Sequence, residues 1–159
     1  MLIGNRHTPD SEIQNWPTSR QVRSLTVLVD DQTLSALLRD DIAWPRDRVF
    51  TSGHWYLRLC QAVVRGAGGA LSRPLLSLPP ARRETALRAV LELPERVEMV
   101  GWRDVAPVMA SQFDGPGRGL NLLSREALAV ASLLQAQVIM AAGNENRLLR
   151  TALQQVGLS

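Results

Sequence analysis

Short apolar runs alternate with amphipathic stretches along most of the chain. The run at residues 25–29 is apolar and β-branched and is followed at once by polar residues, which is typical of a strand buried on both faces. Leu34, Leu37 and Leu38 then recur at helical spacing. The pattern therefore predicts a buried strand followed by a helix at residues 32–39.

The same alternation continues to the end of the chain. Further strands are expected at 48–51, 97–100 and 138–140, and the last of these is expected to be buried. Helices are expected at 55–64, 81–91, 104–112, 124–134 and 145–156, with Ser124 as a cap and a loop at 113–122. Strands that alternate with helices predict an α/β fold, with a small and mostly parallel sheet flanked by helices.

The chain divides into a short arm and one domain. Residues 1–23 are polar and without a period, so we expect a flexible arm there, followed by a single domain at 24–159. The chain has 159 residues and is 45% hydrophobic, which suits one domain. It has no apolar run long enough for a membrane span, no secretory signal and a lone Cys60, so we expect a cytoplasmic protein without membrane contact.

The charge balance points only weakly to an anionic partner. The formal net charge is +3 and the pI is about 10.3, but every cationic side chain is Arg, so a small positive excess carries the pI far upward. The sequence thus predicts a slight attraction to polyanions such as RNA.

Acidic and amide side chains follow the predicted strands where chemistry is expected. Asp30 and Asp31 follow the first strand, Asn144 and Glu145 follow the last, and Glu126 lies in the first turn of the preceding helix. Ligand sites of parallel sheets lie outside the carboxyl ends of the strands. Oxygens that converge there repel each other unless a hard cation such as Mg²⁺ or Mn²⁺ lies between them.

Each of these residues also has a purely structural interpretation. Asp30, which we favour as a ligand, also suits a helix cap, and Asp31 is better suited to be a cap or a solvent-exposed residue. Glu126 is stabilised at any helix N-terminus, Asn144 suits a turn, and Glu145 suits the first turn of a helix.

His54 allows two interpretations as well. It lies beside Trp55 and Tyr56, so it suits a catalytic or base-stacking role, or a structural one.

Three segments of the chain resemble the PIN-domain family. Val27-Leu28-Val29-Asp30 with the helix after it, the segment at 122–131, and the last strand with the terminal helix are similar in order and spacing to that family over about residues 24–159. The resemblance implies a three-layer α/β/α fold and a metal-dependent ribonuclease. It assigns Asp30, Glu126 and Asn144 as catalytic residues and as ligands of Mg²⁺ or Mn²⁺. RNA as substrate, an antitoxin as partner of a toxin, and a homodimer follow from the same likeness.

The sequence departs from the family pattern at two places. The stretch from Thr51 to Arg58 has no carboxylate where the family has an acid, and Asn144 and Glu145 stand where the family has Asp. The sequence therefore leaves two functions open: a PIN-like ribonuclease, and a catalytically degenerate PIN-like domain that binds RNA or a protein. A nucleotide-binding regulator, the third alternative, has no phosphate-cradling Gly motif behind it.

Overall fold

A four-stranded, fully parallel sheet forms the centre of the protein. The computed structural model describes residues 25–66 and 69–158, so the arm predicted at 1–23 lies outside the described residues. The strands are β1 (Thr26–Val29), β2 (Arg48–Phe50), β3 (Val97–Glu98) and β4 (Gln137–Ile139), in the order β3-β2-β1-β4. Leu28 of β1 pairs with Phe50 on one side and with Val138 on the other.

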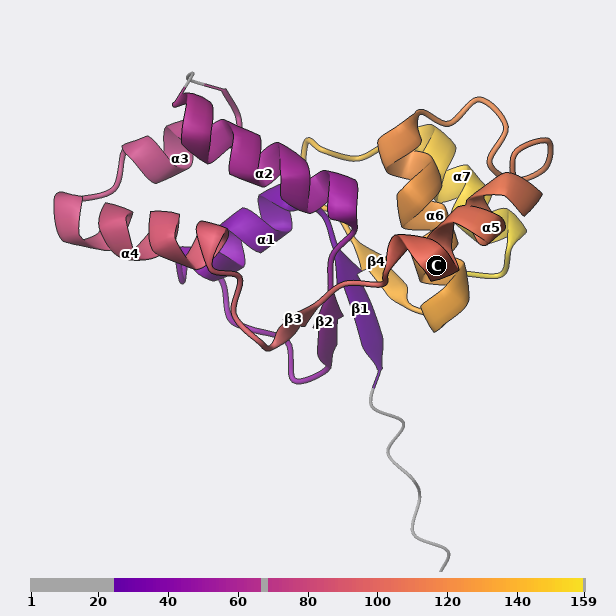
Figure 1. Ribbon diagram of the computed structural model, residues 1–159, viewed down its shortest axis with the longest axis horizontal. Helices are drawn as coiled ribbons and strands as arrows, with labels where there is room; N and C mark the ends of the chain where they lie inside the picture. Colours follow the sequence, from indigo (N-terminus) through magenta and orange to yellow (C-terminus); the bar gives the residue numbers. More distant parts are fainter. Residues whose placement is uncertain (1–24, 67–68, 159) are drawn as a thin grey trace, which may run out of the picture.

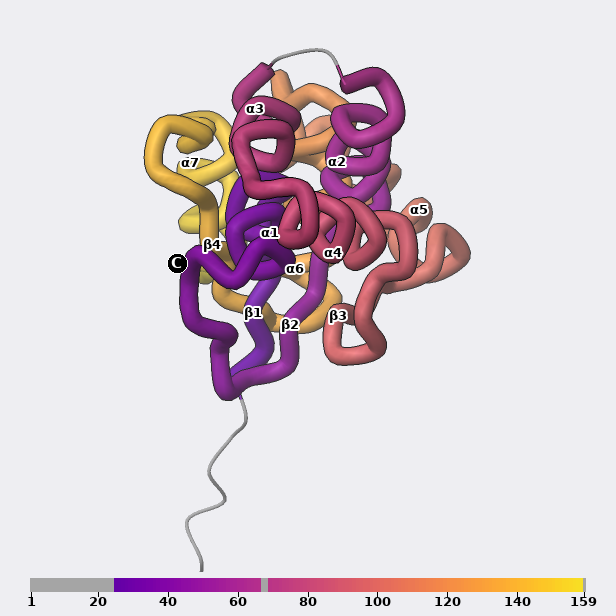
Figure 2. The backbone as a smooth tube through the Cα atoms, turned by 90° about the vertical axis from the view of Figure 1, so that its left-hand side faces the viewer, coloured from indigo at the N-terminus to yellow at the C-terminus, as the bar shows by residue number. Residues whose placement is uncertain are grey.

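Helices cover both faces of this sheet, which makes three layers. Figure 1 shows α1 to α4 on one side and α5 to α7 on the other, and Figure 2 shows the strands running side by side between them. The helices within the described residues are α1 (Asp31–Leu38), α2 (Gly53–Arg65), α3 (Ser72–Leu76), α4 (Pro80–Leu91), α5 (Trp102–Ser111), α6 (Leu122–Leu134) and α7 (Arg147–Gln155). The α/β class predicted from the sequence is confirmed.

Alternating side chains of β1 divide the core in two. Val27 and Val29 pack against α1 to α4, whereas Leu28 packs against α5, α6 and α7. All three are nearly or fully buried. Because successive strand residues point to opposite faces, a strand covered by helices on both sides must be apolar throughout, as the sequence pattern indicated.

Several predicted boundaries are wrong, each for a local reason. Helix α6 begins at Leu122 rather than at Ser124, because Asn121 and not Ser124 accepts the hydrogen bond that caps it. Strand β4 is partly exposed, because it is an edge strand. Helix α7 begins at Arg147, after the cap Asn146. The short helix α3 was not predicted.

No helix within 25–66 or 69–158 is long and apolar enough to span a membrane.

We predict that truncating Leu128, which is fully buried between the sheet and α7, strongly destabilises the fold. Leu128→Ala should lower the free energy of unfolding by roughly 2–5 kcal/mol, because the removed atoms leave a cavity. Leu133→Ala is the matched control on the same helix, and it should cost under about 1 kcal/mol because Leu133 is 41% exposed. Urea unfolding measures both. Equal losses in the two variants would contradict the assigned core.

Candidate functional site

The carboxyl edge of the sheet gathers most of the buried polar side chains. Asp30 and Asp31 follow β1, and Thr51 and Ser52 follow β2. The hydroxyl of Thr51 donates to the carbonyl of Val29 (3.1 Å), which ties the two strand ends together. All four of these polar side chains are buried, so their hydrogen bonds must be completed within the protein.

Asp30 is the N-cap of α1 and is fully buried. Its Oδ1 accepts from the backbone N–H of Thr33 (2.8 Å), and its Oδ2 accepts from the backbone N–H of Ala141 (3.1 Å). The carboxylate thus joins the start of α1 to the loop that follows β4, 111 residues later in the chain. The capping role considered for Asp30 is confirmed, and it extends to a tertiary contact.

Asp31 is fully buried, which corrects the expectation of a cap or a solvent-exposed residue. Arg58 of α2 places Nη1 3.1 Å from Asp31 Oδ2, an ion pair that lacks hydrogen-bond geometry. Burial raises the pKa of the Asp31 carboxyl, the Arg58 guanidinium lowers it, and the neighbouring Asp30 raises it again. Desolvation prevails, so ionisation of Asp31 opposes folding.

Asn144 links the two carboxylates. Its Nδ2 donates to Asp30 Oδ2 at 2.5 Å and lies 3.2 Å from Asp31 Oδ1. An amide nitrogen therefore occupies the place between the acids where an electrostatic argument calls for positive charge. The structure brings Asp30 and Asn144 together, as the sequence predicted.

Glu126, the third predicted site residue, lies at the same edge but contacts a different element. Its Oε1 accepts from the backbone N–H of Gly53 (3.0 Å), and its Oε2 accepts from the backbone N–H of His54 (2.8 Å). Ser52 Oγ accepts from the N–H of Trp55 (3.3 Å). These two side chains satisfy the first three free N–H groups of α2, and the negative charge suits the positive end of the helix dipole.

The close approach of Glu126 depends on Gly53. A Cβ atom at position 53 would lie 3.1 Å from Glu126 Oε1, which is tighter than an ordinary contact. The stretch between Thr51 and Arg58 has no carboxylate of its own, and α6 supplies one to it from a distance of 73 residues along the chain.

A histidine completes the contacts of Glu126. His54 Nδ1 lies 2.9 Å from Glu126 Oε2, and the imidazole packs edge-on against Trp102 with ring centroids 5.5 Å apart. The side chain of His54 is 20% exposed and that of Glu126 is 3% exposed. The buried acid thus fixes the orientation of a partly exposed imidazole.

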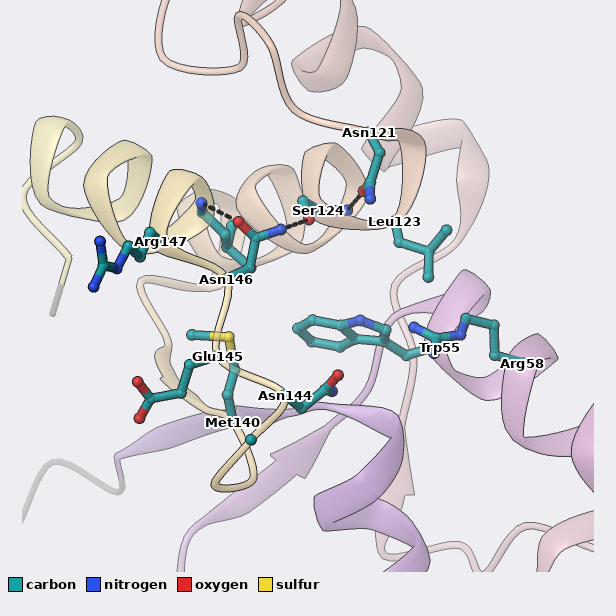
Figure 3. A pocket seen from close by; sticks show the side chains of 12 residues that line it. Trp55, Arg58, Asn121, Leu123, Ser124, Met140, Asn144, Glu145, Asn146 and Arg147 are labelled. Atoms are coloured by element: carbon teal, nitrogen blue, oxygen red, sulfur yellow. Dashed lines mark hydrogen bonds between the residues drawn. The ribbon is translucent and has the colours of Figure 1, made fainter. Parts of the chain in front are cut away.

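A polar cavity of about 390 Å³ opens beside Asn144. It lies between α2, the loop after β4, and the N-terminal ends of α6 and α7. Figure 3 shows Trp55, Arg58 and Asn144 near one another on one side, Asn146 next to Ser124 on another, and Arg147 extending outward at the rim. Asn146 donates to Ser124 Oγ (2.9 Å), which joins the two helix starts.

As they lie, the predicted ligands fit a divalent cation poorly. Asp30 already accepts three N–H donors, and Asn144 turns its amide nitrogen, not its oxygen, toward the acids. Both oxygens of Glu126 accept from the start of α2. Within the part of the chain that the structure describes, no group of three or more His, Cys, Asp or Glu is arranged around one metal position. Metal binding by Asp30, Glu126 and Asn144 stays a prediction.

The roles of Arg58 and Asn146 were not predicted from the sequence. Arg58 lies on the second turn of the helix after β2, close enough to the carboxyl edge to reach Asp31, and helix register was the available signal. Asn146 was hidden because the helix was predicted to begin at Glu145, which instead precedes the helix and pairs with Arg150 (3.0 Å).

Comparison with known proteins adds no identity to this geometry. No family model matches the chain, and the curated proteins contain no significant match.

We predict that Asp31→Asn stabilises the protein at neutral pH. The folded-state pKa of Asp31 is raised, so the stability that this group contributes is fully present below its ordinary value of 3.8 and is lost as the pH rises through the raised value. The variant should raise Tm by about 2–4 °C near neutral pH, and the gain should shrink as the pH falls toward 3.8. Calorimetry across this range measures it.

Asp114→Asn is the control, because Asp114 lies in an exposed loop segment. It should leave Tm nearly unchanged at every pH. A Tm of Asp31→Asn that falls at neutral pH would show that the pair with Arg58 outweighs desolvation.

Proposed function

We propose that this chain is a PIN-like domain whose two buried acids are paired with Arg58 and Asn144 of the same chain, and which binds RNA at the adjacent cavity. The observation that carries the proposal is the enclosure of Asp30 and Asp31 by Arg58 and Asn144. The domain would bind RNA without cleaving it.

The first support is the balance of charge at the carboxyl edge. A cation site needs carboxylate oxygens that are free to be ligands. Here a guanidinium and an amide nitrogen already lie against the two acids, and backbone N–H groups take further positions on Asp30. Adding a divalent cation would require Asn144 and the backbone donors to give up their hydrogen bonds to Asp30, and Arg58 to give up its ion pair with Asp31.

The second support is the donor content of the cavity. Arg58 and Arg147 line it, and Asn121 and Asn146 mark the N-terminal ends of two helices that open on it. Helix N-termini and guanidinium groups both favour phosphate oxygens. Glu145 also lines the cavity, but its charge is paired with Arg150.

RNA suits this site better than a free small anion for reasons of shape. The cavity of about 390 Å³ is lined by residues of α2, the loop after β4 and the starts of α6 and α7, so it offers room for a phosphate within a continuing chain. The net charge of +3 supports a weak, salt-dependent attraction to such a polyanion.

A metal-dependent ribonuclease is the second candidate, favoured by the convergence of Asp30, Asp31 and Asn144 at one edge of the sheet. In that function the PIN-like resemblance assigns Asp30, Glu126 and Asn144 to Mg²⁺ or Mn²⁺. An antitoxin partner and a homodimer belong to this candidate and stay predictions.

We predict that Arg147→Gln weakens RNA binding without unfolding the protein. A short fluorescein-labelled single-stranded RNA in EDTA should bind the variant roughly tenfold more weakly, and the slope of log K against log salt should fall by about 0.7. Arg58→Gln should do the same with an added loss of stability, because Asp31 is left buried without a cation. Fluorescence anisotropy measures the binding.

Arg88→Gln is the matched control, since Arg88 is exposed on α4 and pairs with Glu84 away from the cavity. It removes the same charge and should change the affinity for RNA by less than about twofold, because a solvated charge away from the cavity contributes little. Equal weakening by Arg88→Gln and Arg147→Gln would mean that the cavity is not the RNA site.

We also predict that Asn144→Asp destabilises the protein unless a divalent cation is added. The change places a third carboxylate against Asp30 and Asp31 and removes the donor between them. In EDTA the free energy of unfolding should fall by about 1–3 kcal/mol, and Mn²⁺ should restore it. Thermal unfolding with EDTA and with Mn²⁺ measures both effects.

Asn121→Asp provides the comparison, because Asp caps a helix as well as Asn does and Asn121 caps α6. It should be nearly neutral in both solutions. A wild-type Tm that itself rises with Mn²⁺ would support the ribonuclease. It would count against the proposal that Asp30 and Asp31 are already paired with groups of the protein.

A further inference from the structure

One ring nitrogen of His54, Nδ1, contacts Glu126, and the other, Nε2, has no hydrogen-bond partner among the described residues. Glu126 Oε2 accepts from the backbone N–H of this residue and lies 2.9 Å from its Nδ1. Since a carboxylate can only accept, a neutral imidazole that bonds to it carries its proton on Nδ1. Nε2 then has a lone pair that accepts a hydrogen bond. Within 25–66 and 69–158, no protein group bonds to this nitrogen.

Trp102 provides an aromatic surface beside this acceptor. It is the first residue of α5, it is 51% exposed, and it contacts His54 edge-on with an interplanar angle of 85°. A Cβ atom at the neighbouring Gly101 would meet nothing within 4 Å. Because Trp102 is half exposed, part of its indole is accessible within the described residues.

The surroundings of Trp102 distinguish a small planar ligand from a broad apolar partner. Arg103 and Asp104, which follow it on α5, are exposed and charged. Met99 is the nearest exposed apolar side chain in the sequence, at 45%. Along α5 the indole is therefore followed by charged side chains, whereas protein-docking surfaces are continuous apolar patches.

We propose that Trp102 and His54 form a nucleobase site. An unpaired base stacks on the exposed indole, and one of its N–H groups donates to Nε2 of His54, which Glu126 holds in place. Stacking on aromatic side chains is how proteins bind single-stranded RNA, and it requires bases that are not paired in a duplex. The inference rests on the proposed RNA binding and specifies its substrate class as single-stranded RNA.

The cavity proposed to bind phosphate and the proposed nucleobase site are adjacent on α2. His54 and Trp55 are consecutive residues of α2, so their side chains diverge by about 100° around the helix axis. Trp55 lines the phosphate cavity, and His54 faces Trp102. An RNA strand that places a phosphate in the cavity therefore has a base-binding surface on the neighbouring side of the same helical turn.

Anisotropy titrations with two labelled strands test this site. One strand is single-stranded RNA, and the other is an abasic ribose–phosphate strand of the same length. Wild type should bind the RNA roughly tenfold more tightly than the abasic strand, because only the RNA can stack. Trp102→Ala should remove this preference and leave binding of the abasic strand unchanged.

His54→Phe keeps an aromatic ring but removes the acceptor, so it should reduce the preference in part. Phe113→Ala is the matched control, since Phe113 is an aromatic side chain of similar exposure (52%) that packs under Arg125 elsewhere. It should keep the full preference.

Each remaining outcome counts against the inference in a distinct way. Equal wild-type affinity for both strands, unchanged in Trp102→Ala, would overturn the nucleobase site and leave the proposed phosphate binding standing. If Phe113→Ala lost the preference for RNA over the abasic strand as Trp102→Ala does, the stacking could not be attributed to Trp102. That result would also overturn the nucleobase site. Failure of wild type to bind either strand would overturn both this site and the proposed function.

Discussion

The burial of two consecutive carboxylates at the end of β1 is the constraint on which the rest of this edge depends. Taking a charged carboxylate out of water costs several kcal/mol unless donors replace the lost hydration. Asp30 obtains those donors from the start of α1 and from the loop after β4 with Ala141 and Asn144, and Asp31 lies against Asn144 and forms an ion pair with Arg58 of α2. The contacts that offset the cost of burial also fix the positions of β1, α2 and the β4–α7 loop relative to one another.

A third carboxylate, that of Glu126, serves the neighbouring helix in a similar way. Glu126 completes the hydrogen bonds of the first turn of α2, and in doing so it fixes the imidazole of His54. The acids of this edge are thus occupied by protein donors, while the surface around them presents donors and aromatic rings: Arg58 in the cavity and Trp102 beside His54. The proposed binding of RNA depends on this surface.

The sequence predicted the class of fold because both faces of β1 must be apolar under helices, and that requirement is visible in residues 25–29. It also predicted that Asp30 and Asn144 meet, because parallel strands end at one edge. It did not predict the burial of Asp31. The charged partner of Asp31 is Arg58, which lies on a separate helix, and the local sequence pattern does not determine how that helix packs against β1. Helix starts were misplaced for a related reason: Asn121 is as good a cap as the Ser124 that follows it.

Paramagnetic broadening by Mn²⁺ tests the central claim most directly. In our proposal, groups of the protein already occupy the positions around the two acids. Titrating Mn²⁺ into the wild type should then leave the backbone amide signals of Thr33 and Ala141, which donate to Asp30, as sharp as those of the distant core. Saturable broadening confined to those two amides, absent in Asp30→Asn, would show a divalent cation bound at the carboxylates and would contradict the account.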